Sequence, residues 1–190
     1  MSPLKIYLAL VHYPVINRDA EIIASAVTNL DLHDLARIGC TYGVQRCYIV
    51  TPLVDQQTLV QRIVAHWTRG FGAARNPDRR QAMERLRVAA SLGEAASAVE
   101  KREGRPPLRV ATCARPDDRR LTIAGLRAAA RDGRPCLLVF GTASGLANEL
   151  LQEADAVLEP IRGAGAYNHL PVRAAAAIVL DRLAGDLAER

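Results

Sequence analysis

The stretch Leu137–Leu151, LLVFGTASGLANELL, decides the class of fold that this chain adopts. It begins with an apolar run without polar alternation, which is typical of a strand buried on both faces of a sheet. The run stops at Gly141, small residues follow, and a helical pattern begins near Leu146. A strand, a turn and a helix in this order predict one unit of a parallel sheet with a helix crossing over it.

The same alternation of apolar runs and helical patterns extends over the rest of the chain. Strands are expected at Lys5–Val11, Arg46–Thr51, Leu108–Thr112, Pro135–Phe140 and, weakly, Ala156–Leu158, and helices at Asn29–Tyr42, Gln56–Arg69, Pro77–Leu86, Ser91–Glu103 and Leu121–Arg131. A final helix should run from Pro171 towards Ala188, because proline suits the first helical position and apolar residues follow at helical spacing. The arginine-rich stretch Gly70–Arg80 is expected to be a loop. The predicted class is α/β, a mostly parallel sheet with helices on both faces.

Composition narrows the kind of protein. The 190 residues are 49% hydrophobic and 24% charged, which is ordinary for a globular domain and excludes disorder and coiled coil. The net charge of +5 comes almost entirely from arginine. Arginine suits a nucleic-acid partner, but a GC-rich genome also produces arginine-rich chains, so charge alone leaves both interpretations open. No secretion signal and no apolar run of about 20 residues is present, so we expect no membrane contact and a cytoplasmic location.

Cysteine and histidine spacing excludes several site types. The four cysteines form no C-x-x-C pair and lie in apolar stretches, which favours buried reduced thiols over disulfides or zinc. The four histidines are scattered without metal spacing. Neither a G-x-S-x-G motif nor a P-loop occurs, so hydrolase and P-loop classes are not favoured.

Glycine-rich turns offer a ligand site instead. In an open α/β sheet, ligands bind beyond the carboxyl ends of the strands, where glycines let a ligand approach the backbone. Gly141 and Gly145 occupy such a place. A second glycine-rich loop follows at Gly163–Gly165, and Tyr167–Leu170 leads directly into the final helix, whose entrance has free backbone groups.

Three segments together, VFGTASGL (139–146), EPI (159–161) and YNHLPVRAAAAIVLDRL (167–183), resemble the cofactor-binding end of the SPOUT RNA methyltransferases. The resemblance continues through HYPVINRDAEIIASAVTNLDLHDLARIGCTYGV (12–44) and YIVTPL (48–53), and is closest to a small bacterial family of SAM-dependent RNA methyltransferases. It implies a single SPOUT-like domain over residues 1–190. In that domain, residues from about 108 to 190 form a deep trefoil knot that holds S-adenosylmethionine, and the substrate is a structured RNA, either tRNA or rRNA.

The resemblance also implies the site residues. The expected cofactor-binding residues are Thr112, Gly141, Thr142, Gly145, Ile161, Asn168, His169 and Leu170. Arg37 is expected to act in catalysis, because it stands six residues before Gly43 of Tyr42-Gly43-Val44, as an arginine does in the TrmH-like branch. It would hold a phosphate or favour deprotonation of the attacking group. Close relatives are expected to have Gly-Trp where this chain has Ala143-Ser144.

Two other functions stay open at this point. The fold can serve as a cofactor-binding RNA-interaction or regulatory module without efficient methyl transfer, because no general base is evident. A less favoured alternative is an α/β enzyme for another nucleotide, with Glu159 near the position of a ribose-binding acid. We also expect a homodimer built partly on the final helix, which is apolar on more than one stripe; burial within the monomer is the alternative. In SPOUT dimers, one subunit's Arg37 equivalent lies close to the other subunit's cofactor.

Overall fold

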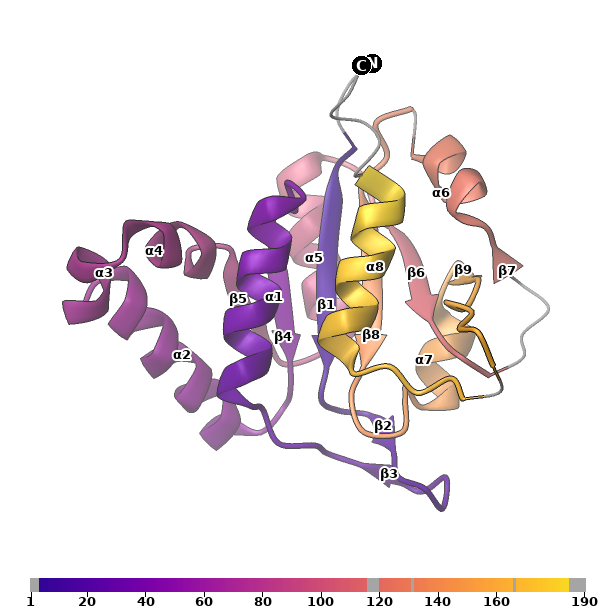
Figure 1. Ribbon diagram of the computed structural model, residues 1–190, viewed down its shortest axis with the longest axis horizontal. Helices are drawn as coiled ribbons and strands as arrows, with labels where there is room; N and C mark the ends of the chain where they lie inside the picture. Colours follow the sequence, from indigo (N-terminus) through magenta and orange to yellow (C-terminus); the bar gives the residue numbers. More distant parts are fainter. Residues whose placement is uncertain (1–3, 116–119, 131, 166, 185–190) are drawn as a thin grey trace.

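The computed structural model describes residues 4–115, 120–130, 132–165 and 167–184 (Figure 1). Its strands are β1 (Ile6–Val11), β2 (Val15–Ile16), β3 (Ile22–Ile23), β4 (Cys47–Val50), β5 (Leu86–Ala89), β6 (Leu108–Thr112), β7 (Arg120–Leu121), β8 (Cys136–Gly141) and β9 (Ala156–Leu158). Seven of them form one sheet in the order β5-β4-β1-β8-β6-β9-β7, in which every neighbouring pair is parallel. The remaining two, β2 and β3, form a short antiparallel hairpin.

Helices cover both faces of the sheet. They are α1 (Asn29–Thr41), α2 (Val54–Thr68), α3 (Phe71–Arg75), α4 (Pro77–Met83), α5 (Leu92–Glu103), α6 (Ile123–Ala129), α7 (Asn148–Glu153) and α8 (Val172–Ala184). Apolar residues of α1, α2, α4, α6 and α8 form one core on the sheet, and those of α5 and α7 form a second core on the opposite face. Figure 1 shows α1 and α8 side by side in front of the sheet and α5 behind it. The predicted α/β class is confirmed.

The central strands form where the sequence is apolar on every residue. All six residues of β1 and all four of β4 are buried, because helices lie on both sides of them. The expected strands Leu108–Thr112 and Ala156–Leu158 agree with β6 and β9 at both ends. Helix α1 begins at Asn29 because the Thr28 side chain accepts the backbone N–H of Asp31 and so caps the first turn.

The stretch 70–80 corrects one expectation, because it is not a loop. Most of it is helical, in α3 and the start of α4. The Asn76 side chain accepts the Arg79 backbone N–H at 2.9 Å, and Pro77 takes the first helical position, so the two helices meet at a capped junction. An arginine-rich composition therefore marks an exposed helical surface here.

Other differences concern the ends of elements. The helix expected over Pro77–Leu86 stops at Met83, and Leu86 opens β5, which pairs with β4 at the edge of the sheet. The helix expected over Leu121–Arg131 is shorter, because Leu121 belongs to β7. Position 131, the expected end of that helix, lies outside the described residues. So do positions 185–190, through which the expected final helix continued to Ala188. Across the described ranges, no helix is both long and apolar enough to cross a membrane. The trefoil knot stays a prediction.

Candidate functional site

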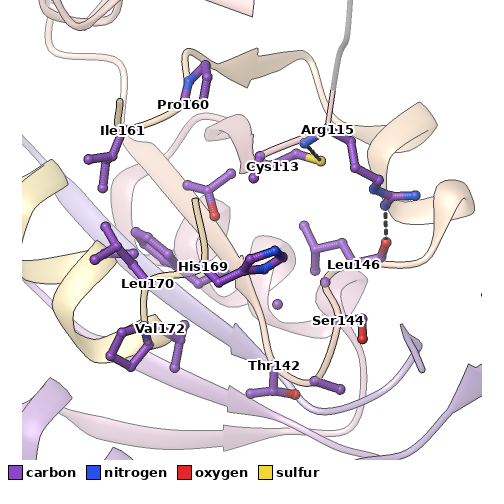
Figure 2. A pocket seen from close by; sticks show the side chains of 18 of the residues that line it. Cys113, Arg115, Thr142, Ser144, Leu146, Pro160, Ile161, His169, Leu170 and Val172 are labelled. Carbon is purple, nitrogen blue, oxygen red and sulfur yellow. Dashed lines mark hydrogen bonds between the residues drawn. The ribbon is translucent and has the colours of Figure 1, made fainter. Parts of the chain in front are cut away.

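A cavity of about 540 Å³ lies where the carboxyl ends of β6, β8 and β9 meet. This volume is in the range of small-molecule sites. All eight residues expected to bind the cofactor line it: Thr112, Gly141, Thr142, Gly145, Ile161, Asn168, His169 and Leu170. Figure 2 shows Ile161, Leu170 and Val172 on one side of the cavity in this view, and Arg115 and Leu146 on the other.

Gly141, the last residue of β8, sets the shape of one wall. A Cβ at this position would lie 2.6 Å from the Leu146 backbone nitrogen and 2.9 Å from the Gly145 carbonyl carbon. The loop therefore folds back onto the strand end only because residue 141 has no side chain. The loop itself is a tight turn, in which the Gly145 N–H donates to the Thr142 carbonyl at 3.0 Å. Ala143 has φ 51°, a conformation that glycine adopts with less strain.

The β2–β3 hairpin holds this loop from outside. The Ile16 N–H donates to the Gly145 carbonyl at 3.0 Å, and the Ser144 N–H donates to the Ile16 carbonyl at 2.9 Å. Val15 and Leu146 form an antiparallel bridge beside these bonds. Sequence reasoning missed this contribution, because two strands of two residues each produce no periodic signal.

Thr142 is fixed by a chain of side chains that leads into the protein interior. Its Oγ1 donates to the Val11 carbonyl at 2.9 Å and lies 2.5 Å from Ser25 Oγ. Ser25 Oγ lies in turn 3.1 Å from Nδ1 of His12, whose Nε2 is buried without a partner in the described structure. Burial lowers the pKa of His12, which favours the neutral imidazole. In the neutral ring, an Nδ1–H would donate to Ser25 Oγ.

Residues 25–31 also line the cavity, although they lie outside the region from about 108 to 190 that was expected to hold the cofactor. Asp31 is the charged member of this segment and is only 8% exposed. Its carboxylate accepts the Thr28 hydroxyl at 2.6 Å and lies 3.4 Å from the Arg173 guanidinium of α8. The domain boundaries stay a prediction.

Two further charged residues at the cavity, Arg115 and Glu159, make structural contacts. The Arg115 guanidinium donates to the Leu146 carbonyl at 2.7 Å and to Asn148 Oδ1 at 3.1 Å, and so ties the end of the glycine loop to α7 (Figure 2). Glu159 Oε1 accepts the Ile123 backbone N–H at 3.1 Å, at the start of α6. This use of Glu159 disfavours the alternative in which it binds a ribose.

Arg37 does not line this cavity. It is exposed on α1, and among the described residues its guanidinium has no hydrogen bond or ion pair. A helix rises 1.5 Å per residue, so Arg37 is about 9 Å further along the axis than Asp31. Its catalytic role stays a prediction. One turn earlier on α1, His33 Nδ1 accepts a hydrogen bond from Arg79 Nη1 at 2.8 Å, so α4 lies next to this part of α1.

Within the described ranges, no three His, Cys, Asp or Glu side chains are grouped so that they would hold a metal ion.

Known proteins are similar to this chain over nearly its whole length. A tRNA (guanine-N(1)-)-methyltransferase of Nitratidesulfovibrio vulgaris is 46% identical over 181 residues, which are 95% of this chain and 42% of that protein. An uncharacterized protein of Aquifex aeolicus is 40% identical over 179 residues, 94% of this chain and 87% of that protein. This chain thus spans about two-fifths of the length of the methyltransferases it matches.

Solved structures share the fold. The SpoU methyltransferase AviRb of Streptomyces viridochromogenes, in complex with AdoMet, superposes with a TM-score of 0.60 at 15% identity, over 100% of this chain and 63% of that one. The fold predicted from the SPOUT resemblance is therefore confirmed. A family model described as SAM-dependent RNA methyltransferase matches residues 5–185. The chain belongs to the family of SAM-dependent RNA methyltransferases.

Proposed function

We propose that this chain binds S-adenosylmethionine and transfers its methyl group to a nucleotide in a structured RNA, either tRNA or rRNA. One observation carries the proposal: the glycine loop, Ile161 and the entrance to α8 converge on a single cavity at the carboxyl ends of parallel strands. Family membership over residues 5–185 supplies the class of chemistry. The guanine-N1 reaction in the name of two relatives belongs to proteins more than twice as long.

The residues present fit this cofactor. The bare backbone at Gly141 and Gly145 lets an adenosine approach closely, and Leu146, Ile161 and Leu170 offer an apolar slot with backbone groups at its edge. When bound, the cofactor supplies an electrophilic methyl group on a sulfonium sulfur. The protein has to hold this group in line with the nucleophile and assist the loss of one proton.

One observation favours the alternative, a cofactor-binding RNA-interaction or regulatory module. Both carboxylates that line the cavity have partners: Asp31 contacts Thr28 and Arg173, and Glu159 accepts the Ile123 amide. Neither carboxylate is free to act as a general base.

Two measurements test the proposal. In calorimetry, S-adenosylhomocysteine should bind and NAD should not; the reverse result refutes the choice of cofactor. Mass spectrometry should then compare modified nucleosides in RNA from a deletion strain and its parent. A missing methylated nucleoside supports methyl transfer and identifies the product, whereas an unchanged profile supports the binding module.

We propose further that a second copy of the chain completes the site and brings its Arg37 to the first copy's cavity. The support is geometric. The Arg37 guanidinium is unpaired among the described residues and lies on α1, beside α8. One stripe of α8 packs into the core, while Ala174, Ala177 and Ile178 on another stripe are only partly buried. A symmetric dimer through this surface would pair the two helices.

Mixing two inactive variants tests the shared site. Arg37→Ala should lose methyl transfer but keep cofactor affinity within a few fold, and Gly141→Ala should bind the cofactor about 30-fold more weakly and so be inactive at limiting cofactor. In a heterodimer, one cavity is intact and faces an intact Arg37, so random reassortment should restore about a quarter of the wild-type activity. No recovery in a mixture that light scattering shows to be dimeric refutes the shared site.

We also propose that the protein works in the reducing cytoplasm. All four cysteines are free, and two of them, Cys47 and Cys136, are buried. Burial raises the pKa of each of these two thiols to about 12, which makes them unreactive at neutral pH. Cell fractionation with an antibody tests the location; recovery in a secreted fraction refutes it.

A further inference from the structure

A second cavity of about 560 Å³ lies far from the cofactor cavity. We call it the arginine pocket, because five arginines line it: Arg46, Arg69, Arg80, Arg85 and Arg87. Arg46 directly precedes β4, and Arg85 directly precedes β5, so the pocket lies at the amino ends of these strands. The cofactor cavity lies at the carboxyl ends of β6, β8 and β9.

The positive charge of the arginine pocket is largely uncompensated. Among the described residues, Glu84 is the one carboxylate that lines it, and its Oε1 is already paired with Arg80 Nε at 3.0 Å. Burial and the positive charges of Arg87, Arg102 and Arg85 lower the pKa of Arg46. These arginines therefore lie close enough to repel one another. A bound anion would relieve this repulsion.

Backbone carbonyls position the guanidinium groups but do not neutralise them. Arg85 Nη1 donates to the Val44 carbonyl at 2.5 Å, Arg46 Nη1 to the Gln45 carbonyl at 2.9 Å, and Arg87 Nη1 to the Leu86 carbonyl at 2.6 Å. The Nε of Arg85 is buried and has no partner among the described residues. The pocket thus holds arginines in place and leaves one buried donor unsatisfied, which is an unfavourable state for an empty site.

We propose that the arginine pocket binds a phosphodiester group of the same structured RNA that is methylated at the cofactor cavity. The inference rests on the proposed function for its partner. Arginine presents paired N–H groups that match phosphate oxygens, and several such cations in one open pocket suit a polyanion. Glu84, engaged by Arg80, leaves the other four arginines to the ligand.

The position of the arginine pocket sets the size of RNA that reaches both sites. A strand of four residues is about 13 Å long, and neighbouring strands are about 4.8 Å apart, so the two cavities are about 20 Å apart across the sheet. An RNA must therefore span about 20 Å to contact both sites, whereas short oligonucleotides that fill only the methylation site should bind without the arginine pocket.

Paired double variants test this contact. Arg69→Gln with Arg87→Gln removes two exposed arginines of the pocket, so the fold should survive, which equal melting temperatures check. Arg105→Gln with Arg134→Gln is the matched control, because it removes the same charge near the amino ends of β6 and β8, where each arginine has a carboxylate partner. The measurement is the salt dependence of binding to unfractionated tRNA.

The pocket variant should lower the slope of log K against log salt by about 0.9 for each lost phosphate contact, and the control should keep the wild-type slope. S-adenosylhomocysteine affinity should be unchanged in both, which separates this test from the cofactor proposal. Equal slopes in all three proteins, or no binding of tRNA by the wild type, overturn the inference. A variant that loses binding of inorganic pyrophosphate but keeps the RNA slope assigns the pocket to a free anion and also overturns it.

Discussion

Replacing Gly141 by alanine is the sharpest perturbation of the cofactor cavity. The new Cβ would lie 2.6 Å from the Leu146 backbone nitrogen, whereas ordinary contacts begin at 3.4 Å, so the loop must move by about 0.8 Å. The loop cannot move alone, because backbone hydrogen bonds to Ile16 hold residues 144 and 145. Overpacking of this kind costs about 2 kcal/mol, which corresponds to about a 30-fold loss of affinity if the cost falls on the binding-competent loop.

Calorimetry with S-adenosylhomocysteine measures the effect directly. Gly163→Ala is the control, because a Cβ there would lie 3.6 Å from the Tyr167 carbonyl oxygen, an ordinary contact, although the residue belongs to the second glycine-rich loop. We expect Gly141→Ala to bind about 30-fold more weakly and Gly163→Ala to bind like the wild type. Equal affinity of Gly141→Ala and the wild type would refute the steric argument, and an equal loss in both variants would refute its restriction to the first loop.

Three other changes test separate parts of the structure. Burial lowers the pKa of His12 below its ordinary 6.5, so the unfolded chain binds a proton just below pH 6.5 that the folded chain does not. The free energy of unfolding should therefore fall as the pH falls through that window, by up to about 1.4 kcal/mol per pH unit, and urea titrations should show a flatter dependence for His12→Gln. Joint replacement of Arg75, Arg79 and Arg80 by glutamine should weaken RNA binding and flatten its salt slope by about one unit per lost phosphate contact; an unchanged slope makes this surface a solvated one. Ala143→Gly should leave the melting temperature unchanged or raise it, because relief of about 1 kcal/mol of strain at φ 51° offsets the entropy of glycine; a clear loss of stability contradicts this.

The central sheet could be predicted because its strands are buried on both faces. Residues 6–11 and 136–140 are apolar throughout, and no helical period competes with a strand there. The edge strand β5 could not be predicted. Its four residues do not alternate, because Leu86 and Ala89 are buried while Arg87 is exposed, and such a short segment looks like the end of the amphipathic helix before it. Pairing with β4 decides its structure, and that contact is not local in sequence.

The site was predictable where ligand-facing residues follow the ends of apolar strands. Gly141, Thr142 and Thr112 belong to this class, because parallel strands bring their carboxyl ends to one edge. The contribution of residues 12–31 was not predictable in the same way. Ser25 reaches the cavity because it hydrogen-bonds Thr142, and His12 lies behind it in the interior. No spacing in the sequence relates these residues, which are more than 100 positions apart from the loop they support.

The charges around the cofactor cavity connect the proposals. Asp31 is held by Thr28 and Arg173, and Glu159 accepts the first backbone N–H of α6, so neither carboxylate of the cavity is a free base. Arg37, whose guanidinium has no partner among the described residues, lies on the exposed side of α1 and does not line this cavity. In the proposed dimer, one chain holds the cofactor and the second chain supplies Arg37. Cofactor affinity should therefore depend on the cavity of a single chain, while turnover should require the second chain and an RNA large enough to reach the arginine pocket.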